Sequence, residues 1–443
     1  MIKFGFARED ITPVRGIGLC GYFEPRPNRG MRDPLNLRAA LFSDGSTVTG
    51  FIEYDLCLLA RELVERFRAG IKAAGLDFAD NLLFSANHTH TGPYAADLWG
   101  LPDPDYLDEL VAKTVFAVKH AYASLADAEL YRGRTECTTL AFNRRFWMKD
   151  GTVLTNPGKL NPDIVKPEGG IDADIPYLVV RQDGFDRLII ANISNHTDTI
   201  GDDFVSADWT GRMEREIQNH YGYDIPVITL IGCQGNINHF NVKNNADQTC
   251  YAEAIRIGKG YAAEIIASLY AIEPLSADRI TVDQLEIEVP PYRVTDAEYN
   301  AAKAVIAEVG SIKAADAKDM TSEGIAAGNL FVKKFFAERL MENRDDPLTE
   351  KRMELMLSVK FGSEFGVVTI PGEGFVEIGQ AIKAASRFPM TMVSCLTMGE
   401  VGYIGMPECY ERGGGYETRP QRTSPAHDMA PKLIAAGIEL LNR

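Results

Sequence analysis

The chain has 443 residues, of which 45% are hydrophobic and 24% are charged, and it contains no low-complexity tract. This is the composition of a globular protein, and it excludes disordered, fibrous and collagen-like classes. A chain of this length can bury an ample core without disulfides or metals. The 46 basic and 62 acidic residues give a formal net charge of −16. Such a charge repels phosphate backbones and anionic membranes, so we expect neither a nucleic-acid partner nor stable membrane association.

The N-terminus and the cysteines indicate a cytoplasmic protein. The opening segment MIKFGFARED turns polar after six residues and lacks the apolar stretch of a secretory signal. No apolar run approaches the roughly 18–20 residues of a membrane span. The seven cysteines are scattered and form no CxxC pair, which favours reduced, buried thiols over a disulfide framework. Secretion is the alternative if a signal was removed.

Short β-branched runs alternate with helical patterns along the chain. In chain order, the patterns predict a strand at 47–56, a helix at 60–75, a strand at 80–86, a helix at 105–125, strands at 176–182 and 187–194, a helix at 208–221, a strand at 226–232, helices at 250–271, 296–309 and 323–343, a strand at 366–370, a helix at 374–386, a strand at 389–398 and a helix at 429–442. This alternation predicts an α/β fold with a mixed, largely parallel sheet flanked by helices.

The chain shows no internal sequence repeat and no Ser/Gly linker. We therefore expect one domain over residues 1–443. The stretch at about 276–350 is richer in Ala, Lys and Glu, which predicts a helical insertion within that domain rather than a separate one.

Polar, Gly-punctuated segments follow five of the predicted strands. They are residues 87–93, 195–198, 233–239, 371–374 and 399–403. Ligands of open α/β sheets bind beyond the carboxyl ends of the strands, so we expect the active site at these ends if the strands lie near one another.

His88 and His90 give the sharpest chemical signal. On an extended backbone, residues i and i+2 project from the same face, so both imidazoles can reach one ion. Imidazole suits zinc, and a catalytic zinc takes three protein ligands and water. His196, at another strand end, is the natural third ligand, whereas two polar loop histidines without a metal are the alternative. His239 adjoins a third strand end and could contact a substrate.

Several ordered motifs resemble the neutral/alkaline ceramidase family, in its zinc-dependent catalytic domain. The segment 87–93 reads NHTHTGP and is close to the family's THTHSGP signature. The other matching segments are Gly5-Phe6-Ala7 with Asp10-Ile11-Thr12-Pro13 and Gly21-Tyr22, Ile52-Glu53-Tyr54-Asp55, Phe142-Asn143-Arg144 with Asn156-Pro157, Asn195-His196, Pro371-Gly372-Glu373, and Tyr403 followed by Glu408, Tyr410, Glu411 and Tyr416.

The resemblance implies a ligand set and roles for other side chains. Zinc would be held by His88, His90, His196, Glu373 and Tyr403. The resemblance places Arg144 in the lining of the active site and Tyr416 near the substrate carbonyl. Without it, Glu373 would be read as a helix N-terminal charge.

Two departures from the family pattern bear on function. Asn238 stands where the family has a serine, so no serine nucleophile is present there, although a metal-activated water needs none. The chain also ends soon after the tyrosine segment, without the immunoglobulin-like domain and signal peptide of typical members.

The sequence therefore predicts a zinc-dependent hydrolase that attacks an amide bond of a small molecule by metal-activated water. Arg144 and Tyr416 would stabilise the oxyanion, and Asn238 and His239 would orient the substrate. The sequence assigns no general base, although His239 and Glu373 are candidates. The segment 143–149 mixes cations with aromatics, which favours the alternative of a small polar or acidic substrate such as a sugar derivative, lactone or ester. The remaining alternative is a homologue that binds a metal or ligand without catalysis.

Overall fold

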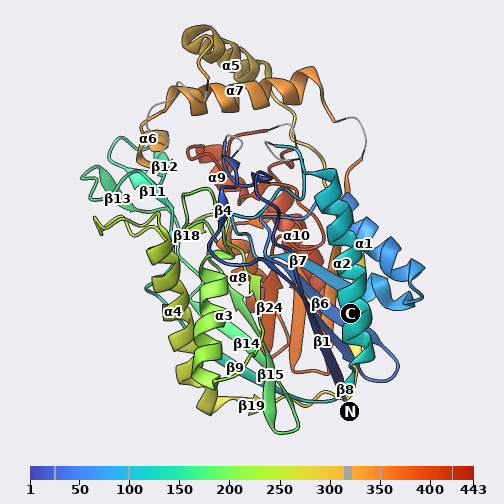
Figure 1. The fold of residues 1–443 in the computed structure, drawn as a ribbon. Coiled ribbons are helices and arrows are strands. Elements are labelled where there is room, and N and C mark those ends of the chain that lie inside the picture. Colours follow the sequence, from blue (N-terminus) through green and yellow to red (C-terminus); the bar gives the residue numbers. More distant parts are fainter. Residues whose placement is uncertain (24–25, 98–99, 314–321, 349–350, 422) are drawn as a thin grey trace.

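The structure is a computed structural model that describes residues 1–23, 26–97, 100–313, 322–348, 351–421 and 423–443 (Figure 1). Three main sheets form its frame. The first contains β1 (Lys3–Asp10), β5 (Asn36–Ser43), β6 (Val48–Tyr54) and β7 (Leu82–Ala86); the second contains β9 (Glu129–Glu136), β14 (Asp174–Gln182), β15 (Phe185–Ile193) and β17 (Val227–Ile231); the third contains β20 (Ile280–Glu288), β21 (Met353–Phe361), β22 (Phe365–Thr369) and β24 (Met390–Ser394).

The three sheets share one topology. In each, the first three strands pair antiparallel in chain order, and the fourth lies parallel to the third. A helix joins the third strand to the fourth, and a second helix follows the fourth. The crossover helices are α1 (Arg61–Ala73), α3 (Asp208–Tyr221) and α8 (Val376–Ala385); the following helices are α2 (Pro104–Ala123), α4 (Tyr251–Ser268) and α10 (Met429–Asn442).

The remaining elements are short strands, turns of helix and an inserted group of helices. The short strands are β2 (Gly18–Leu19), β3 (Arg26–Pro27), β4 (Gly30–Met31), β8 (Ala126–Asp127), β10 (Phe142–Asn143), β11 (Arg145–Met148), β12 (Val153–Thr155), β13 (Ile164–Pro167), β16 (Phe204–Val205), β18 (Ile237–Asn238), β19 (Glu273–Pro274), β23 (Glu373–Gly374) and β25 (Tyr403–Ile404). The helical elements are η1 (Asp77–Asn81), η2 (Leu269–Ala271), α5 (Asp296–Val309), α6 (Ser322–Ala326), α7 (Leu330–Asp345) and α9 (Pro407–Arg412).

One apolar core joins the inner faces of all three sheets. It includes Phe42 from the first sheet, Ile190 from the second and Phe361 from the third, all fully buried. The outer face of each sheet packs on its own pair of helices: α1 with α2, α3 with α4, and α8 with α10. In Figure 1 these pairs surround the sheets, so each sheet is buried on both faces.

The sheets are mixed and mostly antiparallel, so the prediction of a largely parallel sheet is wrong. The parallel pairs of the three main sheets, β6–β7, β15–β17 and β22–β24, are formed by strands that the sequence patterns predicted. Except for β14–β15, both of which were predicted, the antiparallel pairs of these sheets contain the missed strands β1, β5, β9, β20 and β21. Several of them carry charges, which interrupt the apolar runs on which strand prediction depends.

The stretch around 276–350 contains both sheet and helix. Strand β20 belongs to the third sheet, and α5, α6 and α7 follow before β21. The predicted helix at 323–343 is two helices, α6 and α7. Figure 1 shows α5 and α7 packed together beyond one end of the sheets. Among the residues that the structure describes, no helix is long and apolar enough to cross a membrane.

Candidate metal centre

The predicted metal ligands lie at the carboxyl ends of the parallel strands. His88 and His90 follow β7, and His196 follows β15. Glu373 follows β22 in β23, which pairs in parallel with β25, so that Glu373 lies opposite Tyr403. The structure thus brings together residues from all three sheets, as the strand-end argument predicted.

Two histidines and one carboxylate converge in the interior. Glu373 Oε2 lies 3.3 Å from His88 Nε2 and 3.1 Å from His196 Nε2. The three residues are 2%, 0% and 6% exposed, in the order His88, His196 and Glu373. Among the described residues, this group is one of two whose ligand atoms are close enough to share an ion.

The surroundings fix the ring orientation of both histidines. His88 Nδ1 lies 2.8 Å from the carbonyl oxygen of Cys57, and His196 Nδ1 lies 2.9 Å from that of Ile237. A carbonyl oxygen only accepts, so each Nδ1 carries the proton and each Nε2 presents a lone pair to the centre. This is the arrangement that metal-binding histidines have, with the second nitrogen held by a backbone carbonyl.

The side chains of His88, His196 and Glu373 fit a bound cation better than they fit a buried site without one. Glu373 Oε2 is buried and lacks a hydrogen-bond donor among the described residues. A buried carboxylate facing two imidazole lone pairs needs a positive charge between them, and a divalent metal with N and O ligands supplies it.

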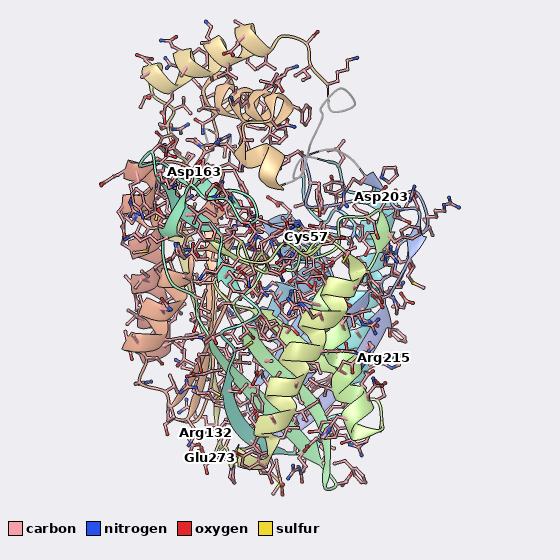
Figure 2. The ribbon with its side chains drawn as sticks, turned by 90° about the vertical axis from the view of Figure 1, so that its left-hand side faces the viewer. Cys57, Arg132, Asp163, Asp203, Arg215 and Glu273 are labelled. Carbon is pink, nitrogen blue, oxygen red and sulfur yellow. The ribbon has the colours of Figure 1, made fainter. Side chains whose placement is uncertain are left out.

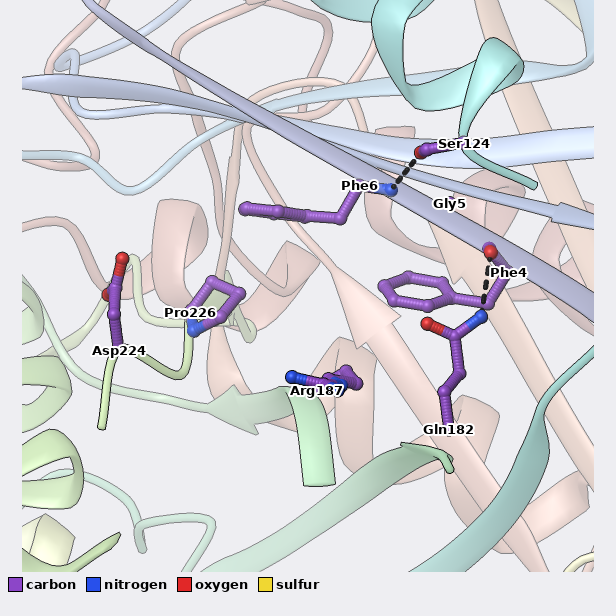
Figure 3. Close-up of a pocket in the computed structure, with 8 residues that line it drawn as sticks. All are labelled: Phe4, Gly5, Phe6, Ser124, Gln182, Arg187, Asp224 and Pro226. Atoms are coloured by element: carbon purple, nitrogen blue, oxygen red, sulfur yellow. Dashed lines mark hydrogen bonds between the residues drawn. The ribbon is translucent and has the colours of Figure 1, made fainter. Parts of the chain in front are cut away.

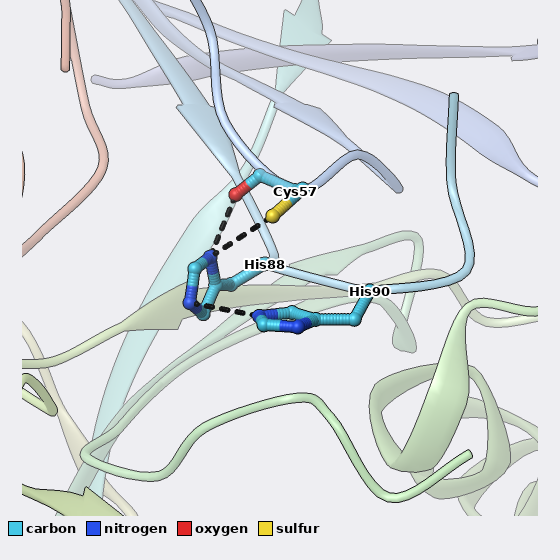
Figure 4. Close-up of side chains that lie close together, drawn as sticks. All are labelled: Cys57, His88 and His90. Atoms are coloured by element: carbon cyan, nitrogen blue, oxygen red, sulfur yellow. Dashed lines mark hydrogen bonds between the residues drawn. The ribbon is translucent and has the colours of Figure 1, made fainter. Parts of the chain in front are cut away.

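His90 and Cys57 form the second candidate group with His88. His90 Nε2 is 3.3 Å from His88 Nε2, and Cys57 Sγ is 3.7 Å from His88 Nδ1 (Figure 4). Burial and the nearby His88 lower the pKa of His90 to about 3, which keeps its imidazole neutral and able to act as a ligand. The structure therefore places His90 at the edge of the centre.

Arg144 presents a fixed positive charge to the same centre. Its Nη1 lies 3.3 Å from His196 Nε2, and its Nη2 donates to the carbonyl oxygen of Gly235 at 2.7 Å. Its Nε is 2.8 Å from Glu417, and both side chains are buried. The guanidinium also lies over the rings of Tyr403 and Tyr416, at 5.3 Å and 5.1 Å from their centroids.

Asn238 and His239 are held inside the loop that supports His196. Asn238 Nδ2 donates to Asn156 Oδ1 at 3.1 Å, and its Oδ1 accepts from the backbone N–H of Phe240. His239 is fully buried, with Nε2 donating to the carbonyl oxygen of Gln248 at 2.6 Å. Direct contact of either side chain with a substrate stays a prediction from the sequence.

Two acidic residues near the centre were missed as site residues. Asp198, two positions after His196, lies 3.5 Å from His239 Nδ1, and its side chain is 21% exposed. Burial and the nearby Glu373 raise the pKa of Glu400 to about 8. Both lie in the polar segments that follow the predicted strands. An acidic residue in such a segment was therefore the feature by which the sequence could have identified them.

Helix α7 contributes aromatic side chains to an apolar cluster next to the centre. Its Phe335 and Phe336 belong to one apolar cluster with Phe23 and Tyr416. Phe23 and Phe335 have ring centroids 5.3 Å apart. Tyr22, the neighbour of Phe23, packs edge-on against His90. The helix thus spans from the loop beside His90 to the loop that carries Tyr416.

A surface pocket lies at a different place in the fold. It has a volume of about 290 Å³ and is lined by Phe4, Gly5, Phe6, Ser124, Gln182, Arg187, Asp224 and Pro226 (Figure 3). None of the predicted site residues lines it. Figure 2 shows Cys57, beside the candidate centre, on the side of the helical insertion, whereas Arg132 and Glu273 lie at the opposite end.

Solved structures of ceramidases share this architecture. The crystal structure of neutral ceramidase from Pseudomonas aeruginosa matches with a TM-score of 0.74 at 17% sequence identity, over 99% of this chain and 74% of that chain. A ceramidase complexed with C2 matches with a TM-score of 0.71 at 18% identity, with the same coverage. No protein-family profile and no curated protein sequence matches the chain. The resemblance read from the sequence motifs is confirmed by the fold.

Proposed function

We propose that the protein is a zinc-dependent hydrolase of the neutral ceramidase type that cleaves the amide bond of a small N-acyl compound. The observation that carries this proposal is the convergence of His88 Nε2 and His196 Nε2 on Glu373 within a ceramidase fold. Imidazole and carboxylate ligands suit zinc. His90 and Tyr403, which border the group, complete the ligand set that the sequence resemblance implies.

A metal held by His88, His196 and Glu373 would supply an activated water, and the chain's own residues would supply the remaining chemistry. Zinc bound by His88, His196 and Glu373 would lower the pKa of a water from about 16 to about 7 and polarise the scissile carbonyl. Arg144 would stabilise the negative charge that develops on the carbonyl oxygen. Its guanidinium is already held by Glu417 and by the Gly235 carbonyl oxygen, so little reorganisation is needed; one such donor contributes about 3 kcal/mol.

The substrate class follows from the fold and from the charges around the centre. Cations in the segment 143–149 favoured a polar or acidic substrate, but each of them has an acidic partner in the protein, buried for Arg144 and Arg145 and exposed for Lys149. Arg145 is fully buried between Glu168 and Glu417, and Lys149 lies 3.5 Å from Asp163. An N-acyl amide is therefore the first substrate class to test, and esters and lactones are the second.

The experiment measures metal content and hydrolysis in the same protein preparations. Metal would be measured in the purified protein, removed with a chelator and restored as zinc, with turnover of N-acyl amines, esters and lactones followed in each state. His196→Ala should lose the metal and turnover, whereas His120→Ala, on the surface of α2, should keep both. Full turnover by the metal-free protein would refute the proposal, and metal binding without turnover of any of these compounds would favour the non-catalytic alternative.

A further inference from the structure

The metal ligand His88 has an unusual backbone conformation. Its φ is +69°, in the left-handed region that glycine favours. The chain turns there between the end of β7 and the loop that carries His90. The ring must nevertheless point at Glu373 Oε2, 3.3 Å from its Nε2. Something other than intrinsic preference must hold this turn.

The side chain of Asn87 spans the turn. Its Oδ1 accepts from the backbone N–H of Thr89 at 3.2 Å, so one amide bridges the residues on both sides of His88. Its Nδ2 donates to Asp55 Oδ1 at 2.6 Å and to Thr210 Oγ1 at 2.8 Å. Asn87 is fully buried, so no water competes for these bonds.

Asp55 is fixed in turn by the sheet. Arg38 Nη1 donates to Asp55 Oδ1 at 2.9 Å, and the backbone N–H of Asn36 donates to its Oδ2 at 2.7 Å. Arg38 also pairs with Glu53 and with Glu214 of α3, and all of these side chains are buried. The chain of bonds thus runs without a break from β5 and α3 to the turn at His88.

We propose that Asp55 and Asn87 are positioning residues for the candidate metal centre. They hold the His88 backbone in its left-handed turn, and thereby aim Nε2 at the position that the metal shares with His196 and Glu373. The inference rests on the proposed function only through the metal centre. Outer-shell partners of this kind change metal affinity by about 10–100-fold when they are removed.

The test compares two buried asparagines. Asn87→Ala removes the bridge, and Asn192→Ala is the matched control, because Asn192 is also buried and donates to the carbonyl oxygens of Leu230 and Val393, away from His88. Zinc affinity would be measured by competition with a chromophoric chelator, and ligand geometry by the visible spectrum of the cobalt-loaded protein. We expect Asn87→Ala to weaken zinc binding by about 10–100-fold and to change the cobalt spectrum, and Asn192→Ala to change neither.

A double variant that exchanges the residues at positions 55 and 87 tests whether a loss of zinc affinity results from the missing hydrogen bond or from misfolding. Asp55→Asn combined with Asn87→Asp restores a hydrogen bond between the two positions and keeps the total charge, but the new amide N–H at position 55 faces the Arg38 guanidinium, which also donates there. The double variant should therefore recover part of the zinc affinity that Asn87→Asp alone loses. Wild-type zinc affinity and an unchanged cobalt spectrum in Asn87→Ala would overturn the proposal. Failure of the wild-type protein to bind zinc would instead refute the metal centre, and so the proposed function itself.

Discussion

Gly21 touches the candidate centre through backbone alone, and alanine at this position should disturb one ligand. A Cβ added to Gly21 would lie 2.5 Å from the Cγ and Nδ1 atoms of His90 and 2.9 Å from its Cβ. Carbon atoms in contact prefer about 3.5–4.0 Å, so the ring must move by roughly 1 Å. Because the clash involves the base of the side chain, rotation of the ring cannot relieve it. A displacement of about 1 Å at a catalytic group costs on the order of 100-fold in turnover.

The matched control for Gly21→Ala is Gly16→Ala. Gly16 has a φ of +100° against +99° for Gly21, but a Cβ at Gly16 would meet nothing within 4 Å. Both variants share the backbone strain, of order 1–3 kcal/mol, and the clash with His90 should add to the loss of stability of Gly21→Ala in urea unfolding. Zinc affinity and turnover should fall only in Gly21→Ala. If both variants kept wild-type zinc affinity and turnover, His90 would not belong to the centre.

Three further substitutions test the electrostatics and helix α7. Glu417→Gln removes the carboxylate that pairs with Arg144, and should lower the free energy of unfolding by about 3 kcal/mol and turnover at least tenfold. Burial raises the pKa of Glu53 to about 8 in the folded protein, above about 4.3 in the unfolded chain. The folded wild type therefore loses stability as pH rises from about 4.3 to 8, because the buried carboxyl must become charged. Urea unfolding should show Glu53→Gln gaining stability relative to wild type between pH 5 and pH 8. Phe335→Ala should speed removal of the metal by a chelator, whereas Leu330→Ala, an exposed position on α7, should not.

Each of these predictions has an outcome that contradicts it. Unchanged turnover in Glu417→Gln would show that Arg144 keeps its position without the carboxylate. Parallel pH profiles for wild type and Glu53→Gln would mean that Glu53 titrates normally in the folded protein. Equal rates of metal removal in Phe335→Ala and wild type would show that α7 does not limit access to the centre.

Strands were predictable where the sequence is continuously apolar. The predicted strands include every parallel pair of the three main sheets, because these strands lie in sheets buried on both faces and read as apolar runs. The strands β5 and β21 are also buried, but they contain Arg38 and Lys360, each buried in an ion pair with a residue far away in the sequence. A local sequence pattern assigns a charged residue to the surface, because it does not include the distant partner whose ion pair allows that residue to be buried.

The metal centre was also predictable only where its residues are marked by local features of the sequence. The HxH spacing of His88 and His90 and the strand-end position of His196 are local features. Glu373 and Tyr403 meet only through the pairing of β23 with β25, so spacing could not select them and the family resemblance did. The bridge from Asp55 to Asn87 likewise depends on the parallel pairing of β6 with β7, which no single segment encodes.

The three-unit topology explains why the ligands are so widely separated in the sequence. His88 follows the second strand of the first parallel pair, whereas His196 and Glu373 follow the first strands of the other two. Because ligands bind where parallel strands end, three such ends facing one interior place one ligand from each unit around a single point. A fragment with one or two units would present at most two of these three groups. Metal binding therefore reports the assembly of all three units, because each unit contributes one of these ligands.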